Sequence, residues 1–101
     1  MKIVIRPEGF KLSKLQRAQL QTRLELLLSR FAQRIPLVTA TLSNARGIPG
    51  YKRCQLEVGV DAELVSTEHS DINVFLALEH AATRAARSVG RAIEKQSWML
   101  R

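Results

Sequence analysis

The sequence has very little cysteine, no long apolar run and no apolar leader, and each absence argues against a class of protein. Its single cysteine, Cys54, cannot form an internal disulfide, so nothing in the chain requires an oxidising compartment. No apolar run approaches the ~20 residues that a membrane span needs. Residues 1–6 become charged too early for a secretory signal peptide. We therefore expect a cytoplasmic protein with no membrane partner.

Arrangements of residues that carry catalysis are missing as well. Cys54 alternates with Leu56 and Val58, which predicts a buried, inert thiol rather than a nucleophile. His69 and His80 have no cysteine or further histidine at a metal-ligand spacing, so the sequence predicts no zinc site. No glycine-rich phosphate loop or strand-to-helix serine elbow is present. The sequence thus predicts no enzyme, no cofactor, no metal and no small-molecule substrate.

What the chain does contain is enough apolar residues for a core and an uneven positive charge. Of its 101 residues, 46% are hydrophobic, which fits one domain over residues 1–101 that folds without disulfide or metal. The net charge is +7, yet no Lys or Arg lies between Arg53 and Arg84, and six of the nine acids lie between Glu57 and Glu79. Such asymmetry is typical of a protein that meets a polyanion with one surface and turns its acids away.

Four segments have the pattern of β-strands. Residues 37–43 and 53–60 alternate apolar and polar side chains, as half-buried strands do. Asp61 and Ala62 make a short hairpin connection, so the last three strands should form an antiparallel meander. The expected strands are residues 2–6, 37–43, 53–60 and 64–68.

Two segments show helical periodicity with recognisable start signals. Ser13 and Gln16 have the spacing of a capping box, and the helix they begin should run to about Gln33, because Pro36 prevents continuation. A second helix should extend to about Gln96. Three residues offer N-caps for it: Ser70, Asp71 and Asn73.

These elements predict an α+β fold in the order β-α-β-β-β-α. Two amphipathic helices can both cover one face of a four-stranded sheet and leave the other face to solvent. The apolar positions of the first helix are Leu20, Leu24, Leu27, Leu28 and Phe31. Those of the second are Phe75, Leu78, Ala82, Ala85, Ala86, Val89 and Ile93.

The second helix carries the clearest functional signal. Four of its basic residues fall at i, i+3, i+7 and i+11: Arg84, Arg87, Arg91 and Lys95. They span about 80° of arc, almost opposite the apolar stripe. Like charges at this spacing cost a few tenths of a kcal/mol, so a helix that needs only solubility normally mixes signs. We interpret the stripe as a phosphate-binding face, since arginine forks match phosphate; the alternative is a solvated outer face.

Further basic residues lie on the first helix and around the loop between the second and third strands. Arg23, Arg30 and Arg34 fall at i, i+7 and i+11 on the flank of the first helix's apolar face. If both helices cover one sheet face, their outer surfaces join into one basic surface. The loop residues that either extend this surface or belong to a solvated turn are Arg46, Lys52 and Arg53.

The second helix resembles that of the ribosome hibernation promoting factor family, which includes ribosome-associated inhibitor A. That family's helix opens with a pattern close to Asp-x-Tyr-Ala-Ala-Ile-Asp, followed by spaced basic residues. Residues 73–79 here read Asn-Val-Phe-Leu-Ala-Leu-Glu, and Arg84, Arg87 and Arg91 follow. Three positions depart from the family pattern: Asn73, Phe75 and Leu76.

The first helix extends the resemblance over nearly the whole chain. In the family this helix follows a short strand and a Thr or Ser cap, as at Ser13, and ends near an aromatic and an Ile, as at Phe31 and Ile35. The family's β-α-β-β-β-α order also agrees. Long forms carry an extra C-terminal domain that dimerises ribosomes. This chain ends at Arg101, soon after the expected second helix, so it resembles the short form.

The resemblance implies a ribosome-associated translation inhibitor, or hibernation factor. Such proteins bind the small ribosomal subunit in the mRNA and tRNA channel, contact rRNA through basic helix faces, and silence translation during stress or stationary phase. The residues by themselves indicate only a basic α+β protein that binds RNA. The alternative is a non-ribosomal regulatory module that recognises an acidic protein or another RNA.

Overall fold

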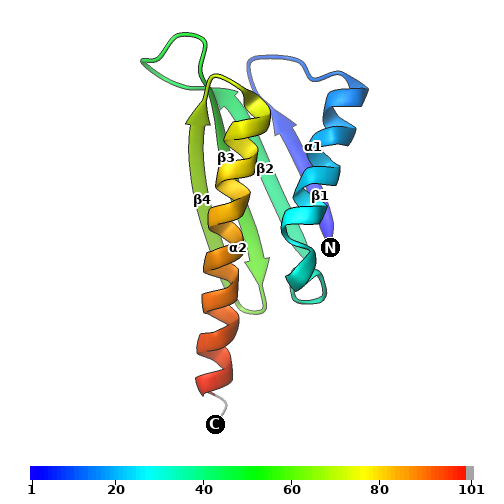
Figure 1. Cartoon of the computed structure of the whole chain (residues 1–101), viewed down its shortest axis with the longest axis vertical. Helices are drawn as coiled ribbons and strands as arrows, with labels where there is room; N and C mark the ends of the chain where they lie inside the picture. The colour runs from blue at the N-terminus through cyan, green and yellow to red at the C-terminus, as the bar shows by residue number, and fades with distance from the viewer. Residues whose placement is uncertain (100–101) are drawn as a thin grey trace.

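The computed structural model describes residues 1–99 and confirms the α+β architecture, with α1 and α2 side by side on one face of the sheet (Figure 1). The sheet has the strand order β1-β2-β3-β4; β1 and β2 are parallel and the other neighbours antiparallel. The elements are β1 (Lys2–Pro7), α1 (Lys14–Leu27), the 3-10 helix η1 (Ser29–Arg34), β2 (Leu37–Asn44), β3 (Lys52–Val60), β4 (Glu63–Asp71) and α2 (Val74–Met99).

The strand register places the inward side chains in rows that cross the sheet. One row joins Ile5, Ala40 and Leu56 and ends at Thr67 on β4. The next joins Leu42 and Cys54 and ends at His69. The rows are apolar through β2 and β3, and two of them become polar at the edge strand β4. The polar side chains of Thr67 and His69 therefore lie at the border between β4 and α2.

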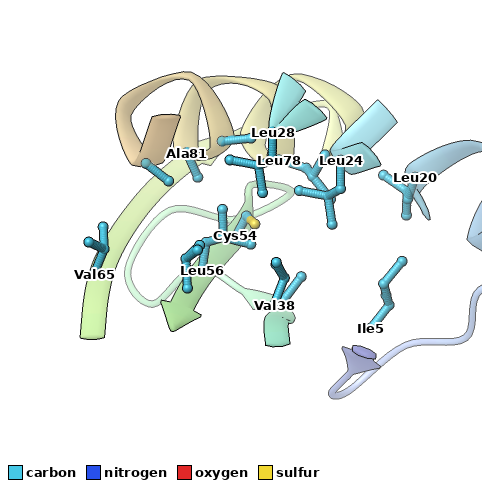
Figure 2. Close-up of a cluster of buried hydrophobic side chains, with 14 of the residues drawn as sticks. Ile5, Leu20, Leu24, Leu28, Val38, Cys54, Leu56, Val65, Leu78 and Ala81 are labelled. Atoms are coloured by element: carbon cyan, nitrogen blue, oxygen red, sulfur yellow. The ribbon is translucent and has the colours of Figure 1, made fainter. Parts of the chain in front are cut away.

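The core lies between these rows and the two helices. Leu20, Leu24 and Leu28 of the first helical segment and Leu78 of α2 are fully buried, and they face the sheet (Figure 2). Ala81 of α2 is also fully buried, although the sequence pattern did not assign it to the apolar stripe. No polar or charged side chain is buried within residues 1–99, so the interior there consists of close-packed apolar groups.

The first helix begins as the sequence predicts but ends earlier. The Ser13 hydroxyl accepts from the amide of Gln16, and the amide of Ser13 donates to the Gln16 side chain, which confirms the capping box. The α-helix ends at Leu27 rather than near Gln33, and a 3-10 segment continues to Arg34. The Ser29 hydroxyl donates to the carbonyl of Leu26, which competes with α-helical pairing at this point.

The fourth strand and the second helix are both longer than predicted. Strand β4 pairs with β3 through to Asp71, beyond the expected end at residue 68, because backbone pairing continues where apolar alternation stops. Asn73 is the N-cap of α2; its side chain accepts from the amide of Phe75, whereas Asp71 belongs to β4. The helix runs to Met99 rather than Gln96.

The length of α2 exceeds that of the sheet beneath it. Its 26 residues span about 39 Å, whereas the nine residues of β4 span about 30 Å. The C-terminal part of the helix consequently projects past the end of the sheet (Figure 1). Among residues 1–99, no helix has the length and apolarity that crossing a membrane requires.

A matched pair of leucines in α1 tests the core. Leu24 is fully buried, whereas Leu26 is 61% exposed. We expect Leu24→Ala to lower the free energy of unfolding by about 2–5 kcal/mol, because it leaves a cavity under α1. Leu26→Ala should change it by less than about 0.5 kcal/mol. Urea denaturation followed by circular dichroism measures both, and equal losses would contradict this packing.

Cys54 gives a second test of the core. Burial raises the pKa of its thiol to about 12, so at pH 8 only about one molecule in ten thousand carries the reactive thiolate. We expect the folded protein to resist Ellman's reagent and to react only as fast as it unfolds. Rapid modification at pH 8 without denaturant would show that β3 opens independently of global unfolding.

Candidate nucleic-acid interface

Arginines from both helical segments meet at a groove between η1 and α2. Arg30 of η1 faces Arg87 and Arg91 of α2 across a groove of about 500 Å³. The guanidinium of Arg30 lies 5.4 Å from the ring centre of Phe31, which forms part of the groove floor. The remaining lining residues are Leu27, Ala86, Gly90 and Glu94. The groove thus has an apolar floor and a mainly basic rim.

Gly90 of α2 lies against the Phe31 ring of η1. A Cβ at this position would lie 3.4 Å from the Cζ atom of Phe31, at the short limit of ordinary contact. A side chain larger than alanine would therefore require the Phe31 ring to shift. The close contact between the Phe31 ring and α2 therefore occurs at a glycine that the sequence pattern did not single out.

A second hollow lies on the other side of the same arginines, between α2 and the edge strand β4. It has a volume of about 250 Å³ and is lined by Thr67, Arg84, Arg87, Ser88 and Arg91. Arg87 and Arg91 line both the groove and this hollow, so they form a ridge, or crest, between the two along α2. We call Arg30, Arg84, Arg87 and Arg91 the arginine cluster.

Two hydrogen bonds join α2 to β4. The Arg84 guanidinium donates to the backbone carbonyl of Glu68 at 3.1 Å, and the Thr67 hydroxyl donates to the backbone carbonyl of Ala81 at 2.8 Å. A backbone carbonyl of β4 thus accepts from a side chain of α2, and a backbone carbonyl of α2 accepts from a side chain of β4. The basic stripe therefore borders β4, which corrects the expectation that it lies almost opposite the core. The helix buries a wider arc than predicted, because Ala77, Ala81 and Ala92 are buried as well.

The arginine cluster brings together basic side chains that have no acidic partner. Other basic residues, such as Lys2, Arg6 and Lys11, are also outside the ion pairs of the described residues, but they do not line the groove or the hollow beside α2. Within residues 1–99, Arg30, Arg84, Arg87 and Arg91 form no ion pair. All four are exposed. Their charge is therefore not cancelled by a carboxylate within salt-bridge distance, which is the arrangement that attracts phosphate.

Four other predicted site residues are paired with acids. Arg23 pairs with Glu79, Arg34 with Asp61, Arg53 with Glu68, and Lys95 with Glu63 at 4.0 Å. Hydrogen bonding to Arg34 lowers the pKa of the Asp61 carboxyl, so that pair stays charged at neutral pH. Asp61, Glu63, Glu68 and Glu79, four of the acids between Glu57 and Glu79, therefore lie beside basic residues. These pairs offset the charge of basic residues outside the arginine cluster.

The structure does not bring the three loop-region residues into the arginine cluster. Arg53 points to the sheet face that the helices leave uncovered, where it pairs with the side chain of Glu68. Lys52 lies 4.4 Å from the ring centre of Phe10 and donates to Asn44. Arg46 is exposed in the loop of residues 45–51, at the end of the sheet opposite the C-terminal end of α2 (Figure 1).

The two histidines, which the spacing argument treated as isolated, lie together at the border of β4 and α2. The ring centres of His69 and His80 are 4.6 Å apart. Burial, followed by the nearby charges of His80 and Arg84, lowers the pKa of His69. Sequence spacing could not show this contact, because it depends on which face of β4 the first turns of α2 cover.

Comparisons with known proteins identify the fold but do not assign a family. No protein-family model matches the sequence, and no match is found among curated proteins. A ribosomal subunit interface protein from Coxiella burnetii has a similar structure, with a TM-score of 0.81 and 10% identity over 93% of this chain and 99% of that one. The N-terminal domain of Protein Y from Thermus thermophilus superposes with a TM-score of 0.74 and 22% identity, over 90% and 98% of the two chains.

A charge-matched pair of variants tests the arginine cluster. R84Q/R87Q/R91Q and K2Q/R6Q/K11Q each lower the net charge from +7 to +4, but the second set removes exposed residues of β1 and the segment before α1. Four arginines on single-stranded RNA give a slope of log affinity against log salt of roughly −3. The first variant should lose about two units of that slope, and the control less than one.

Fluorescence anisotropy with labelled poly(U) at several salt concentrations measures these slopes. If both variants lose affinity and slope equally, binding depends on net charge alone, and the arginine cluster is not the interface.

Proposed function

We propose that this protein is a ribosome-associated translation inhibitor, or hibernation factor, of the cytoplasm. It binds rRNA of the small ribosomal subunit in the channel that mRNA and tRNA use, and it does so through the arginine cluster. Such a protein silences ribosomes under stress or in stationary phase. It needs no catalytic group, because it acts by occupying the channel.

The observation that carries the proposal is the arginine cluster without acidic partners. A guanidinium can form two parallel hydrogen bonds to one phosphate, and neighbouring arginines along a helix can follow consecutive phosphates of an RNA strand. Arg87 and Arg91 are open to ligands from two sides, because each lines a hollow on either flank of α2. A rigid helix about 39 Å long keeps these groups in register.

The shared fold supports the choice of the ribosome over other RNA. A protein whose name places it at the ribosomal subunit interface has the same fold over almost its whole length. Identity of 10% leaves little common sequence, so we transfer only the ribosome as partner, and take the contact residues and the mode of binding from this chain. The exposed sheet face carries Thr39, Thr41 and Gln55 and no aromatic platform, which argues against base stacking there.

The dimensions of the protein suit inhibition by occupancy. The described residues extend 49 × 28 × 17 Å, a slab with the cluster along one border. A slab of this size can fill a groove lined with rRNA phosphate and exclude mRNA and tRNA. Inhibition should therefore be stoichiometric and reversible by competitors for the same site.

A titration in cell-free translation tests this mechanism. We expect inhibition to reach its maximum near one molecule per ribosome and to be relieved by excess tRNA and mRNA. R84Q/R87Q/R91Q should inhibit much less than K2Q/R6Q/K11Q at equal concentration. Inhibition far below one molecule per ribosome would indicate turnover, and hence an enzyme.

Sedimentation of cell extract tests the partner itself. The protein should travel with the small subunit on a sucrose gradient and be released by RNase. Association that survives RNase treatment and follows an acidic protein would instead support the alternative of a non-ribosomal regulatory module.

A further inference from the structure

Three ligand-type side chains converge where β4 meets the start of α2. His69 and Asp71 occupy alternate positions of β4, so both point to the helix-facing side of the strand. His80 projects from the second turn of α2. One ligand atom from each of the three residues lies within 4.8 Å of the others. This cluster belongs neither to the core nor to the arginine cluster.

The donor set suits a divalent transition metal. Two imidazole nitrogens and one carboxylate oxygen are ligands that Zn²⁺ accepts, whereas Mg²⁺ and Ca²⁺ prefer oxygen alone. Ligand bonds of about 2.0–2.1 Å in a tetrahedral site place neighbouring ligand atoms roughly 3.3 Å apart. Closing the cluster therefore requires side-chain movements on the order of 1 Å. His80 is exposed and can rotate to make them.

The carboxylate is already oriented by the backbone. The Oδ1 atom of Asp71 accepts from the amide of Asn73 at 2.9 Å. This bond holds the side chain in position and leaves Oδ2 free to bind a cation. Hydrogen bonds of this kind, which orient a ligand from behind, are typical of protein metal sites.

We propose that His69, Asp71 and His80 bind one Zn²⁺ ion, with solvent completing its coordination. A metal held here links β4 to α2 at the end of the strand, beside Arg84, and stabilises the attachment of α2 to the edge of the sheet. The proposal is independent of the proposed function, because it rests on ligands outside the arginine cluster. It also reverses the expectation from sequence that the two histidines bind no metal.

Titration of the metal-free full chain with Zn²⁺ tests this site. Calorimetry should give a stoichiometry of one, and at a hundredfold excess over Kd the melting temperature should rise on the order of 10 °C. The chain has only two histidines, so the imidazole signals in an NMR spectrum report on the site directly. Both should shift on addition of one equivalent. An absence of binding, or of these shifts, would overturn the proposal.

Variants test whether His69, Asp71 and His80 are the residues that bind the metal. H80Q and D71N should each weaken Zn²⁺ binding by more than the ~10- to 100-fold typical of losing an orienting partner. E57Q, which changes an exposed acid on β3, should bind as the unaltered chain does. Circular dichroism confirms that each variant is folded, and the NMR measurement needs no variant. Undiminished binding by a folded H69Q/H80Q double variant would place the metal elsewhere and contradict the proposal.

Discussion

The close packing of α2 on the edge strand β4 is the constraint on which the rest of the structure depends. Ala77, Ala81 and Ala92 are buried along one side of the helix, and their small side chains let the helix approach the strand. The hydrogen bond from Thr67 to the carbonyl of Ala81 then links the two elements directly. This packing determines which side of α2 reaches solvent, and so where its arginines stand.

The same packing explains why the arginine cluster keeps its positive charge although acids of β4 and α2 lie near its basic residues. Glu63 and Glu68 of β4, Asp61 of the preceding turn and Glu79 of α2 each pair with a basic residue at the margin of the structure. Arg87 and Arg91 stand on the crest of α2 between two hollows, beyond salt-bridge distance of those acids. The acids that pair with Arg23, Arg34, Arg53 and Lys95 thus leave the charge of the arginine cluster uncancelled.

Much of the fold was predictable because it follows from local patterns. The alternation at Cys54, Leu56 and Val58 and the capping box at Ser13 both depend on residues close in sequence, and the structure confirms them. The polar end of β4 could not be predicted in this way. Backbone pairing with β3 continues there without the apolar alternation that marks a strand.

The candidate site was predictable only in part, for a related reason. Helical spacing placed Arg84, Arg87 and Arg91 on one side of α2, but it could not show which basic residues face acids from other elements. The pairing of Arg34 with Asp61 joins residues that are 27 positions apart. The contact between His69 and His80 likewise depends on how β4 and α2 pack against each other. A spacing rule describes one helix or one strand at a time, so it cannot predict such a contact.

The most direct test of the central claim is to map where α2 lies on the ribosome. Cys54 is buried, so a cysteine at Thr83, beside the arginine cluster, can carry an iron chelate that cleaves nearby RNA, with a cysteine at Glu57 on the uncovered sheet face as its control. The T83C probe should cleave small-subunit rRNA along the mRNA and tRNA path more strongly than the E57C probe. Stronger cleavage from E57C, or cleavage confined to another part of the ribosome, would contradict the claim.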